Sequence, residues 1–203
     1  MQNNFSILTV CTGNICRSPL AQNLLEQKLQ EFPEITVSSA GTHAMVGESM
    51  FAESQKIALS LGVEDVESHR ARQLSEGILE SADLILTMTR EQRRDVVELS
   101  PRATRRVFTV REFARLAEAT TDEFLADDLR SVEDTTPEKL RAAINSVALS
   151  RSVVPAVSDP SEDEVIDPYR ESVEVHQASA EQLVPALDTV ANLVRRALVG
   201  TAT

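Results

Sequence analysis

Residues 5–19 read Phe5-Ser6-Ile7-Leu8-Thr9-Val10-Cys11-Thr12-Gly13-Asn14-Ile15-Cys16-Arg17-Ser18-Pro19. The apolar part predicts a β-strand that ends near Val10, and the apolar spacing from Leu20 to Leu29 predicts a helix. Pro19 suits the first turn of that helix, where a missing N–H costs little. A loop between a strand and a helix N-terminus turns backbone N–H groups toward one point. We therefore expect this loop to bind an anion the size of phosphate.

Two side chains of the loop predict chemistry as well as binding. Cys11 begins the loop near the helix N-terminus and near Arg17, and both of these favour its thiolate form. Arg17 presents a planar fork of donors that fits two phosphate oxygens. A thiolate directed at a bound phosphoryl group would displace the leaving group through a thiophosphate intermediate. Ser18 could donate a hydrogen bond to the sulfur, and Gly13 and Asn14 suit a tight turn.

Other kinds of site share parts of this pattern. A Cys-x5-Arg spacing also occurs by chance, and a buried cysteine is often only a small apolar side chain. A Walker-type nucleotide loop is excluded because no Gly-Lys-Ser/Thr follows the glycine. Zinc is not expected, because Cys11 and Cys16 are the only cysteines and no nearby histidine completes a ligand set. We expect neither a metal nor a cofactor.

The rest of the chain predicts an α/β fold. Strands are expected at about 5–10, 35–40, 83–88 and 106–110, and helices at about 18–31, 49–61 and 90–99, with a short turn near 71–80. This alternation predicts one domain, residues 1–203, with a central four-stranded parallel sheet flanked by helices on both faces. Ligands of such sheets bind at the carboxyl ends of the strands, where Cys11 begins its loop.

The segment from Cys11 to Pro19 resembles, at every position, the signature of the low-molecular-weight protein tyrosine phosphatases. Further resemblances to that family follow in chain order: Ser39-Ala40-Gly41-Thr42, His69-Arg70-Ala71-Arg72-Gln73-Leu74, Asp83-Leu84-Ile85-Leu86-Thr87-Met88 and Asp167-Pro168-Tyr169. Together they cover residues 5–110 and about 165–198. The resemblance implies the same fold and the hydrolysis of phosphotyrosine in protein substrates.

The resemblance also implies a role for each matching residue. Cys11 would be the nucleophile, Arg17 would bind the phosphoryl group, and Asp167 would act first as general acid and then as general base. The phosphate-binding loop would comprise Thr12, Gly13, Asn14, Ile15, Cys16 and Ser18, with Ser39 as a supporting residue. The resemblance implies that Cys16 can pair with Cys11 under oxidation. It could also be a small side chain that packs beneath the loop, and the two roles are compatible.

Asp159 is a second candidate for the general acid, because it is also followed by a proline. Asp159-Pro160 continues with Ser161 and lacks the aromatic residue, so Asp167 is the preferred acid. Tyr169 is the only tyrosine. We expect it to pack beside the substrate ring or to hold the acid loop, in preference to serving as a phosphorylation site.

The wall of the substrate slot departs from part of the family. Some members place a large aromatic residue in the loop after the second strand, but here Met45, or else His43, must form that wall. Met45 could equally be an ordinary apolar anchor. Non-aromatic walls resemble the bacterial branch associated with capsule and exopolysaccharide tyrosine kinases, so such a kinase or its targets are candidate substrates.

Two other functions remain open on this scaffold. An arsenate reductase is disfavoured because the chain has no extra cysteine pair and does have Asp-Pro-Tyr. A non-catalytic phosphotyrosine-binding module is disfavoured because both the nucleophile and the acid are intact.

Residues 111–165 are more than a compact member of the family needs between its fourth strand and its acid loop. Helices are expected from Arg111 to Leu129 and from Pro137 to Leu149, with Thr136 as the cap, followed by a linker at 152–163. We hypothesise that this family-atypical insertion, at about 111–160, packs beside the active-site mouth. The last helix is expected at about 176–198, and Pro185 predicts that it is kinked or begins later.

Composition narrows the partners and the compartment. The formal net charge is −12, and residues 111–175 contribute 16 acidic against 7 basic side chains. This acidic balance disfavours binding to nucleic acid or an anionic membrane. No apolar run approaches 18 residues, no signal peptide is expected, and a reactive thiol needs a reducing compartment. We expect a cytoplasmic enzyme that is a monomer or a weak dimer.

Overall fold

The computed structural model describes residues 4–199 and contains a four-stranded parallel sheet. Its strands are β1 (Phe5–Cys11), β2 (Ile35–Gly41), β3 (Leu84–Thr87) and β4 (Val107–Thr109), in the order β2-β1-β3-β4. Strand β1 lies in the centre, where Val10 pairs with Ala40 on one side and with Thr87 on the other. The loop that follows β1 is therefore surrounded by the carboxyl ends of β2 and β3.

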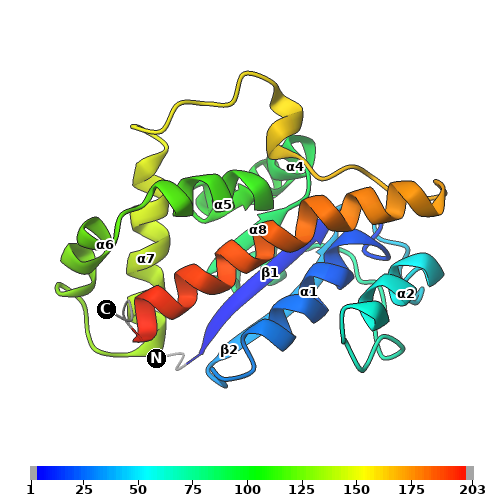
Figure 1. Cartoon of the computed structure of the whole chain (residues 1–203), viewed down its shortest axis with the longest axis horizontal. Coiled ribbons are helices and arrows are strands. Elements are labelled where there is room, and N and C mark those ends of the chain that lie inside the picture. The colour runs from blue at the N-terminus through cyan, green and yellow to red at the C-terminus, as the bar shows by residue number, and fades with distance from the viewer. Residues whose placement is uncertain (1–3, 200–203) are drawn as a thin grey trace.

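Helices cover both faces of the sheet (Figure 1). The helices are α1 (Arg17–Lys28), α2 (Ala52–Ser60), α3 (Glu76–Glu80), α4 (Arg90–Leu99), α5 (Val110–Ala119), α6 (Asp122–Leu129), α7 (Thr136–Ser150) and α8 (Val173–Val199), with 3-10 turns η1 (Pro101–Arg105) and η2 (Pro160–Asp163). Alternate residues of β1 enter two cores, because successive side chains of a strand point to opposite faces. Ile7 packs with α1, α5, α7 and α8, whereas Leu8 packs with α3, α4 and η1. The expected fold class is confirmed.

The helices of the insertion differ from the expectation at two points. The segment expected as one helix from Arg111 to Leu129 forms two helices, because the helical conformation is interrupted at Thr120 and Thr121. Thr121 accepts a hydrogen bond from the Phe124 amide and so caps α6, while the buried Thr120 hydroxyl contacts Leu116 O and Ser150 Oγ. Helix α7 begins at Thr136 itself, so the N-cap position falls on Thr135, which caps without a side-chain hydrogen bond.

Helix α8 begins at Val173, earlier than expected, and continues through Pro185 to Val199 as one helix. Of the two alternatives that Pro185 suggested, a kink or a later start, the later start is wrong. Proline removes one hydrogen bond from a helix. The buried face of Leu183, Leu187 and Val190 packs against the sheet-side core and offsets that loss. Among residues 4–199, no helix combines the length and apolarity needed to cross a bilayer.

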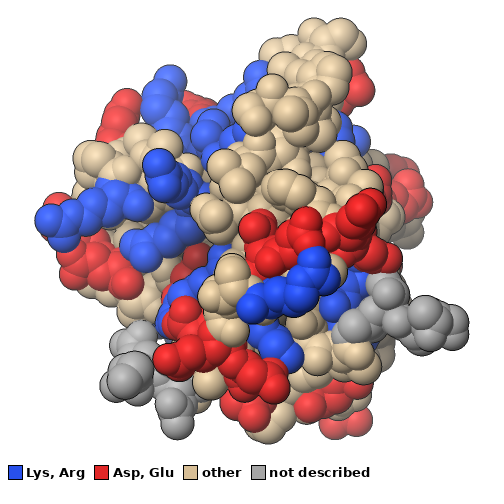
Figure 2. All heavy atoms as spheres, turned by 90° about the vertical axis from the view of Figure 1, so that its left-hand side faces the viewer, with Lys and Arg blue, Asp and Glu red and all other residues tan. Residues whose placement is uncertain are grey.

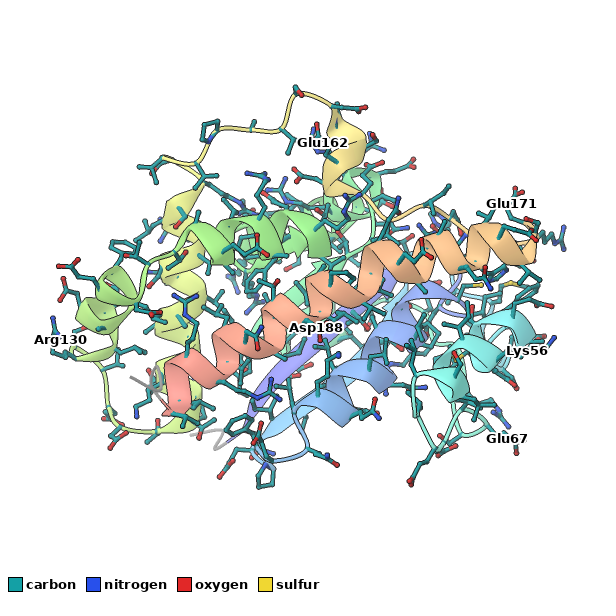
Figure 3. The ribbon with its side chains drawn as sticks, viewed as in Figure 1. Lys56, Glu67, Arg130, Glu162, Glu171 and Asp188 are labelled. Carbon is teal, nitrogen blue, oxygen red and sulfur yellow. The ribbon has the colours of Figure 1, made fainter. Side chains whose placement is uncertain are left out.

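Helices α6 and α7 lie away from the carboxyl ends of the strands. Arg141 on α7 binds Asp83 at 2.9 Å, and Asp83 accepts the Ser6 amide near the start of β1. Figure 3 shows Arg130, the residue that follows α6, at the opposite end of the molecule from Glu171, which follows the acid loop. The hypothesis that the insertion packs at the active-site mouth is therefore wrong for these two helices. The segment that returns from α7 through η2 reaches that end (Figure 1), as does Arg111 at the start of α5.

The end of the molecule formed by α6 and α7 carries both signs of charge (Figure 2). Lys and Arg lie there beside Asp and Glu, as in the ion pairs Arg196–Asp122 and Lys139–Asp134. Exposed pairs of this kind contribute little to stability, on the order of 0–1 kcal/mol each. The acidic excess of the insertion is thus partly balanced at the surface.

Candidate active site

The loop from Cys11 to Arg17 joins the end of β1 to the start of α1 and surrounds the Cys11 sulfur. Ser18 Oγ lies 3.0 Å from the Cys11 Sγ, and the backbone N–H of Asn14 donates a hydrogen bond to the same sulfur at 3.3 Å. Both donors stabilise negative charge on sulfur. Cys11 is only 2% exposed, so the sulfur lies at the floor of the loop.

Asn14 holds the loop in shape. Its φ of 55° is in the left-handed region, which asparagine tolerates better than most residues. Its Nδ2 donates to Ser18 Oγ and to Ser39 Oγ, both at 2.9 Å, and its Oδ1 accepts the Arg72 amide at 2.9 Å. Because Ser18 Oγ already accepts from Asn14, its own proton is free to point at the Cys11 sulfur.

Four residues around this network have roles that the sequence did not indicate. His69 Nε2 donates to Asn14 O at 2.7 Å, since a carbonyl can only accept, and burial lowers the pKa of this histidine. Gln22 accepts from Ser39 Oγ, and Arg72 Nε donates to Ser39 O. His69 and Arg72 belonged to a segment with a family resemblance but no assigned role.

The fourth residue is Gln92, which joins α4 to the loop. Its Nε2 donates to Thr12 Oγ1 at 3.0 Å, while its Oε1 accepts the amides of Met88 and Thr89. Thr89 in turn caps α4 by accepting the Gln92 amide, which completes a capping box. A Thr-x-x-Gln spacing is typical of a helix start and could have indicated the cap, but nothing in the sequence indicated the contact with Thr12.

Arg17 projects from the first turn of α1 into the same loop and is 3% exposed. Its Nη1 donates to Val165 O at 3.1 Å, and its Nη2 lies 2.6 Å from Asp167 Oδ2. Its Nε is buried and has no hydrogen-bond partner among the described residues. This buried donor on the loop that begins at Cys11 suits an anion that brings its own acceptor oxygens.

The two candidate acids occupy different positions. Asp167 has a half-exposed side chain, with one oxygen on Arg17 and the other on the Tyr169 amide at 3.2 Å. Asp159 instead caps η2 by accepting the Ser161 amide, and this bond holds its pKa below the usual value. Asp167 therefore lies at the loop that begins at Cys11, whereas the Asp159 carboxylate is bound within the η2 turn that it caps.

A cavity of about 590 Å³ opens beside the ion pair of Arg17 and Asp167. Its lining includes Thr12, Arg17, Gln92 and Asp167, together with Arg111 of α5 and with Glu162 and Glu164 of the returning segment. Among residues 4–199, no group of three or more His, Cys, Asp or Glu side chains is arranged to hold a metal ion. Arg17 lines this cavity with N–H donors that suit the oxygens of a phosphate ester.

The remaining candidate residues lie around the loop. Met45 is 39% exposed and its backbone N–H binds Gly13 O, so it stands at the edge of the loop, while His43 is exposed and contacts Thr42. Tyr169 packs against a small core of Ile15, Cys16 and Ala71. Phe51, which the sequence did not indicate, meets Tyr169 edge to face at 5.9 Å.

Cys16 is buried in that small core, and both cysteines are free thiols. Burial raises the pKa of the Cys16 thiol to about 12. Cys16 is therefore a neutral thiol at physiological pH, and Ser54 is its hydrogen-bond partner.

Comparison with known proteins places the chain in a family. The family model described as "Low molecular weight phosphotyrosine protein phosphatase" matches residues 6–146. The low molecular weight protein-tyrosine-phosphatase Ptp of Acinetobacter johnsonii is 39% identical over 103 residues, which are 51% of this chain and 70% of that protein. A protein-arginine-phosphatase of Geobacillus stearothermophilus is 37% identical over 109 residues, 54% of this chain and 71% of that one. The crystal structure of the Erwinia amylovora tyrosine phosphatase amsI superposes with a TM-score of 0.64 at 26% identity, over 95% of this chain and 93% of that one.

Proposed function

Because the chain belongs to the low molecular weight phosphotyrosine protein phosphatases, and is thus a phosphatase of tyrosine phosphates, we propose that it works through a cysteinyl-phosphate intermediate on Cys11. The observation that carries this proposal is the convergence of three groups: a sulfur that accepts from an amide and a hydroxyl, a buried arginine with a free donor, and an aspartate on that arginine. These are the nucleophile, the phosphate ligand and the acid that the reaction needs.

In the first step, the Cys11 thiolate attacks phosphorus. The S–P bond forms while the bond from phosphorus to the tyrosine oxygen breaks, and the protonated Asp167 gives its proton to that oxygen. Arg17 and the loop N–H groups of residues 12–17 bind the three phosphoryl oxygens as charge builds on them. Protonation matters because a phenolate leaves far more easily as the neutral phenol.

In the second step, the Asp167 carboxylate removes a proton from water. The water oxygen attacks phosphorus, the S–P bond breaks, and inorganic phosphate and the Cys11 thiolate are released. Ser18 Oγ and the Asn14 amide stabilise the leaving thiolate, because both lie within hydrogen-bond distance of Sγ. Asp167 ends this step protonated, ready for the next substrate.

The substrate we propose is a phosphotyrosine-containing protein. A bacterial tyrosine kinase of capsule or exopolysaccharide synthesis, or one of its targets, is our candidate, supported by the non-aromatic residue Met45 at the edge of the loop. The enzyme would act in the cytoplasm as a monomer or weak dimer that binds neither nucleic acid nor membrane. The two free thiols and the net charge of −12 support this setting.

We further propose that residues 1–203 form one phosphatase domain with a helical insertion at about 111–160. Its support is a single sheet whose helical cover includes α5 and α7, both of which contribute to the larger core.

The experiment that tests the mechanism is hydrolysis of 4-nitrophenyl phosphate against pH by the wild type, Cys11→Ser and Asp167→Asn. We expect no turnover by Cys11→Ser. We expect Asp167→Asn to lose the alkaline-side decline, with a smaller loss of rate on this good leaving group than on phenyl phosphate, whose more basic phenolate needs the proton. Asp159→Asn is the matched control and should keep the wild-type profile. A wild-type profile in Asp167→Asn would contradict the acid assignment.

The substrate class is tested with three phosphoryl or arsenyl compounds in parallel. Phosphotyrosine peptide should be hydrolysed, while phosphoarginine peptide and arsenate should be poor substrates. Preferential turnover of phosphoarginine would contradict the proposed substrate class and would indicate the activity for which the Geobacillus relative is named. Arsenite release without aryl phosphate turnover would contradict the phosphatase mechanism.

A further inference from the structure

Asp163 is a buried carboxylate that the proposed mechanism does not use. It lies at the end of η2 and is 3% exposed. Its Oδ2 binds Arg90 Nη2 and Arg115 Nη2, each at 3.2 Å, and its Oδ1 binds Arg115 Nε at 3.3 Å. A buried charge is retained only when it is paired and hydrogen-bonded. These contacts therefore hold the end of η2 against α4 and α5.

The chain from Asp163 to Asp167 is held at every residue. Glu164 Oε1 accepts the Arg90 amide at 2.9 Å, and Glu164 O accepts from Arg111 Nη1 at 2.7 Å. The Val165 amide donates to Met88 O, and Val165 O accepts from Arg17. The Ile166 amide donates to Gln182 Oε1 on α8 at 2.9 Å. The position of the Asp167 carboxylate therefore depends on a fixed segment whose first anchored residue is Asp163.

The first turn of α4 is a common support for both halves of the site. Arg90, its first residue, binds Asp163 and Glu164 through its side chain and its amide. Gln92, two residues on, binds Thr12 in the Cys11 loop. The η2 turn, marked by Glu162 in Figure 3, lies over this end of α4. The first turn of α4 therefore fixes the position of the acid segment relative to the Cys11 loop.

We propose that Asp163 is a positioning residue for proton transfer by Asp167. Its ion pairs with Arg90 and Arg115 hold the acid segment, so that the Asp167 carboxyl reaches the leaving oxygen when the P–O bond breaks. This inference rests on the proposed function, since it requires that Asp167 donate a proton. Asp163 itself touches neither the substrate nor the sulfur in this role.

The test compares two aryl phosphates whose leaving groups need the acid to different degrees. 4-Nitrophenolate leaves readily without a proton, whereas the more basic phenolate of phenyl phosphate depends on one. Asp163→Asn keeps the shape of the side chain and removes its charge. We expect kcat/KM of this variant to fall about tenfold or more for phenyl phosphate and by less than about threefold for 4-nitrophenyl phosphate. The matched control is Asp159→Asn, in the same segment, which should leave both values near wild type.

A double-mutant cycle adds a readout that general destabilisation would not change. In the Asp167→Asn background, Asp163→Asn should cost almost nothing further, because the acid that it positions is already absent. Equal losses on both phosphates, or losses that add in the double variant, would overturn the proposal. If Asp163→Asn shows no cooperative thermal unfolding, Arg115→Gln is the second variant. It removes two of the three contacts and must meet the same criterion.

Failure of the underlying mechanism gives a different result. Wild-type protein that does not hydrolyse 4-nitrophenyl phosphate, or a Cys11→Ser variant that still does, would refute the thiolate mechanism. If turnover requires Cys11 but Asp163→Asn lowers kcat/KM equally for the two aryl phosphates, only the positioning role of Asp163 is refuted.

Discussion

Arg17 Nη2 lies 2.6 Å from Asp167 Oδ2, although the two residues come from opposite ends of the sequence. The guanidinium is buried, whereas the carboxylate is about half exposed. The same guanidinium binds Val165 O, so one side chain of the Cys11 loop holds both the backbone and the carboxylate of the acid segment. Closing this contact brings a candidate proton donor to the rim of a candidate phosphate site.

Arg17→Lys tests whether the planar fork matters more than the charge. Lysine keeps the positive charge but cannot donate to Val165 O, Asp167 and a phosphoryl oxygen in one plane. We expect kcat/KM for aryl phosphate to fall about 100-fold or more, as when a transition-state donor is removed. Arg94→Lys, at an exposed position on α4, is the control and should change little. Activity near wild type in Arg17→Lys would contradict the role given to the fork.

Gly41→Ala tests how closely β2 approaches the Cys11 loop. A Cβ at Gly41 would lie 2.5 Å from Thr12 O and 3.0 Å from Ala44 Cα, both of them backbone atoms. The loop must therefore shift, and we expect a loss of about 1–3 kcal/mol in the free energy of unfolding together with a marked loss of activity. Denaturant titration and aryl phosphate turnover measure the two effects.

Gly77→Ala on α3 is the matched control for Gly41→Ala. A Cβ there meets no heavy atom within 4 Å, and alanine is a better helix former than glycine. We expect unchanged activity and a gain of about 0.5–1 kcal/mol in the free energy of unfolding. Equal behaviour of the two variants would argue against a specific contact between Gly41 and Thr12.

Cys16 should resist alkylation in the folded protein. Burial raises the pKa of its thiol to about 12, so the reactive thiolate is scarce at pH 8. We expect iodoacetamide to leave folded Cys11→Ser unlabelled at pH 8, and to label it once in denaturant, as read by intact mass. Rapid labelling of the folded variant would show that the small core around Cys16 opens readily.

Stability should fall as the solution becomes mildly acidic. His176 is buried and stacked on Phe51, with neither ring nitrogen hydrogen-bonded within the described chain, and burial lowers its pKa below the ordinary 6.5. The unfolded chain then binds more protons than the folded one. Stability is therefore full above pH 6.5 and is lost as the pH falls through the folded pKa, by up to about 1.4 kcal/mol per pH unit for each such histidine. His69, with a pKa lowered in the same direction, adds to the effect.

His176→Phe should reduce this acid sensitivity while keeping a ring against Phe51. Denaturant midpoints between pH 5 and pH 7.5 measure the slope for the wild type and the variant. His43→Gln, at an exposed ring, is the control and should retain the wild-type slope. An unchanged slope in His176→Phe would show that other groups dominate the acid limb.

Much of the fold could be predicted because its signals are local. The four strands begin and end within two residues of the expected positions, since short apolar runs between turn residues leave little choice. The break at Thr120 and Thr121 was missed because the apolar spacing continues across it, and only the cap at Thr121 separates the helices. The placement of α6 and α7 could not be predicted, because it depends on how their apolar side chains, such as Leu125 and Leu140, pack into the larger core.

By itself, the sequence determined the α/β class, because the alternation of strands and helices is a local signal that predicts a parallel sheet. It indicated the loop between β1 and α1, for which we propose phosphate binding. It also singled out Cys11, Arg17 and Asp167 as the residues to examine. Only the tertiary structure decided that Asp167 meets Arg17 while Asp159 caps its own turn, and that Gln92, His69 and Arg72 support the loop. These contacts join residues far apart in the chain, and the packing of whole elements against the sheet, which no local pattern encodes, brings them together.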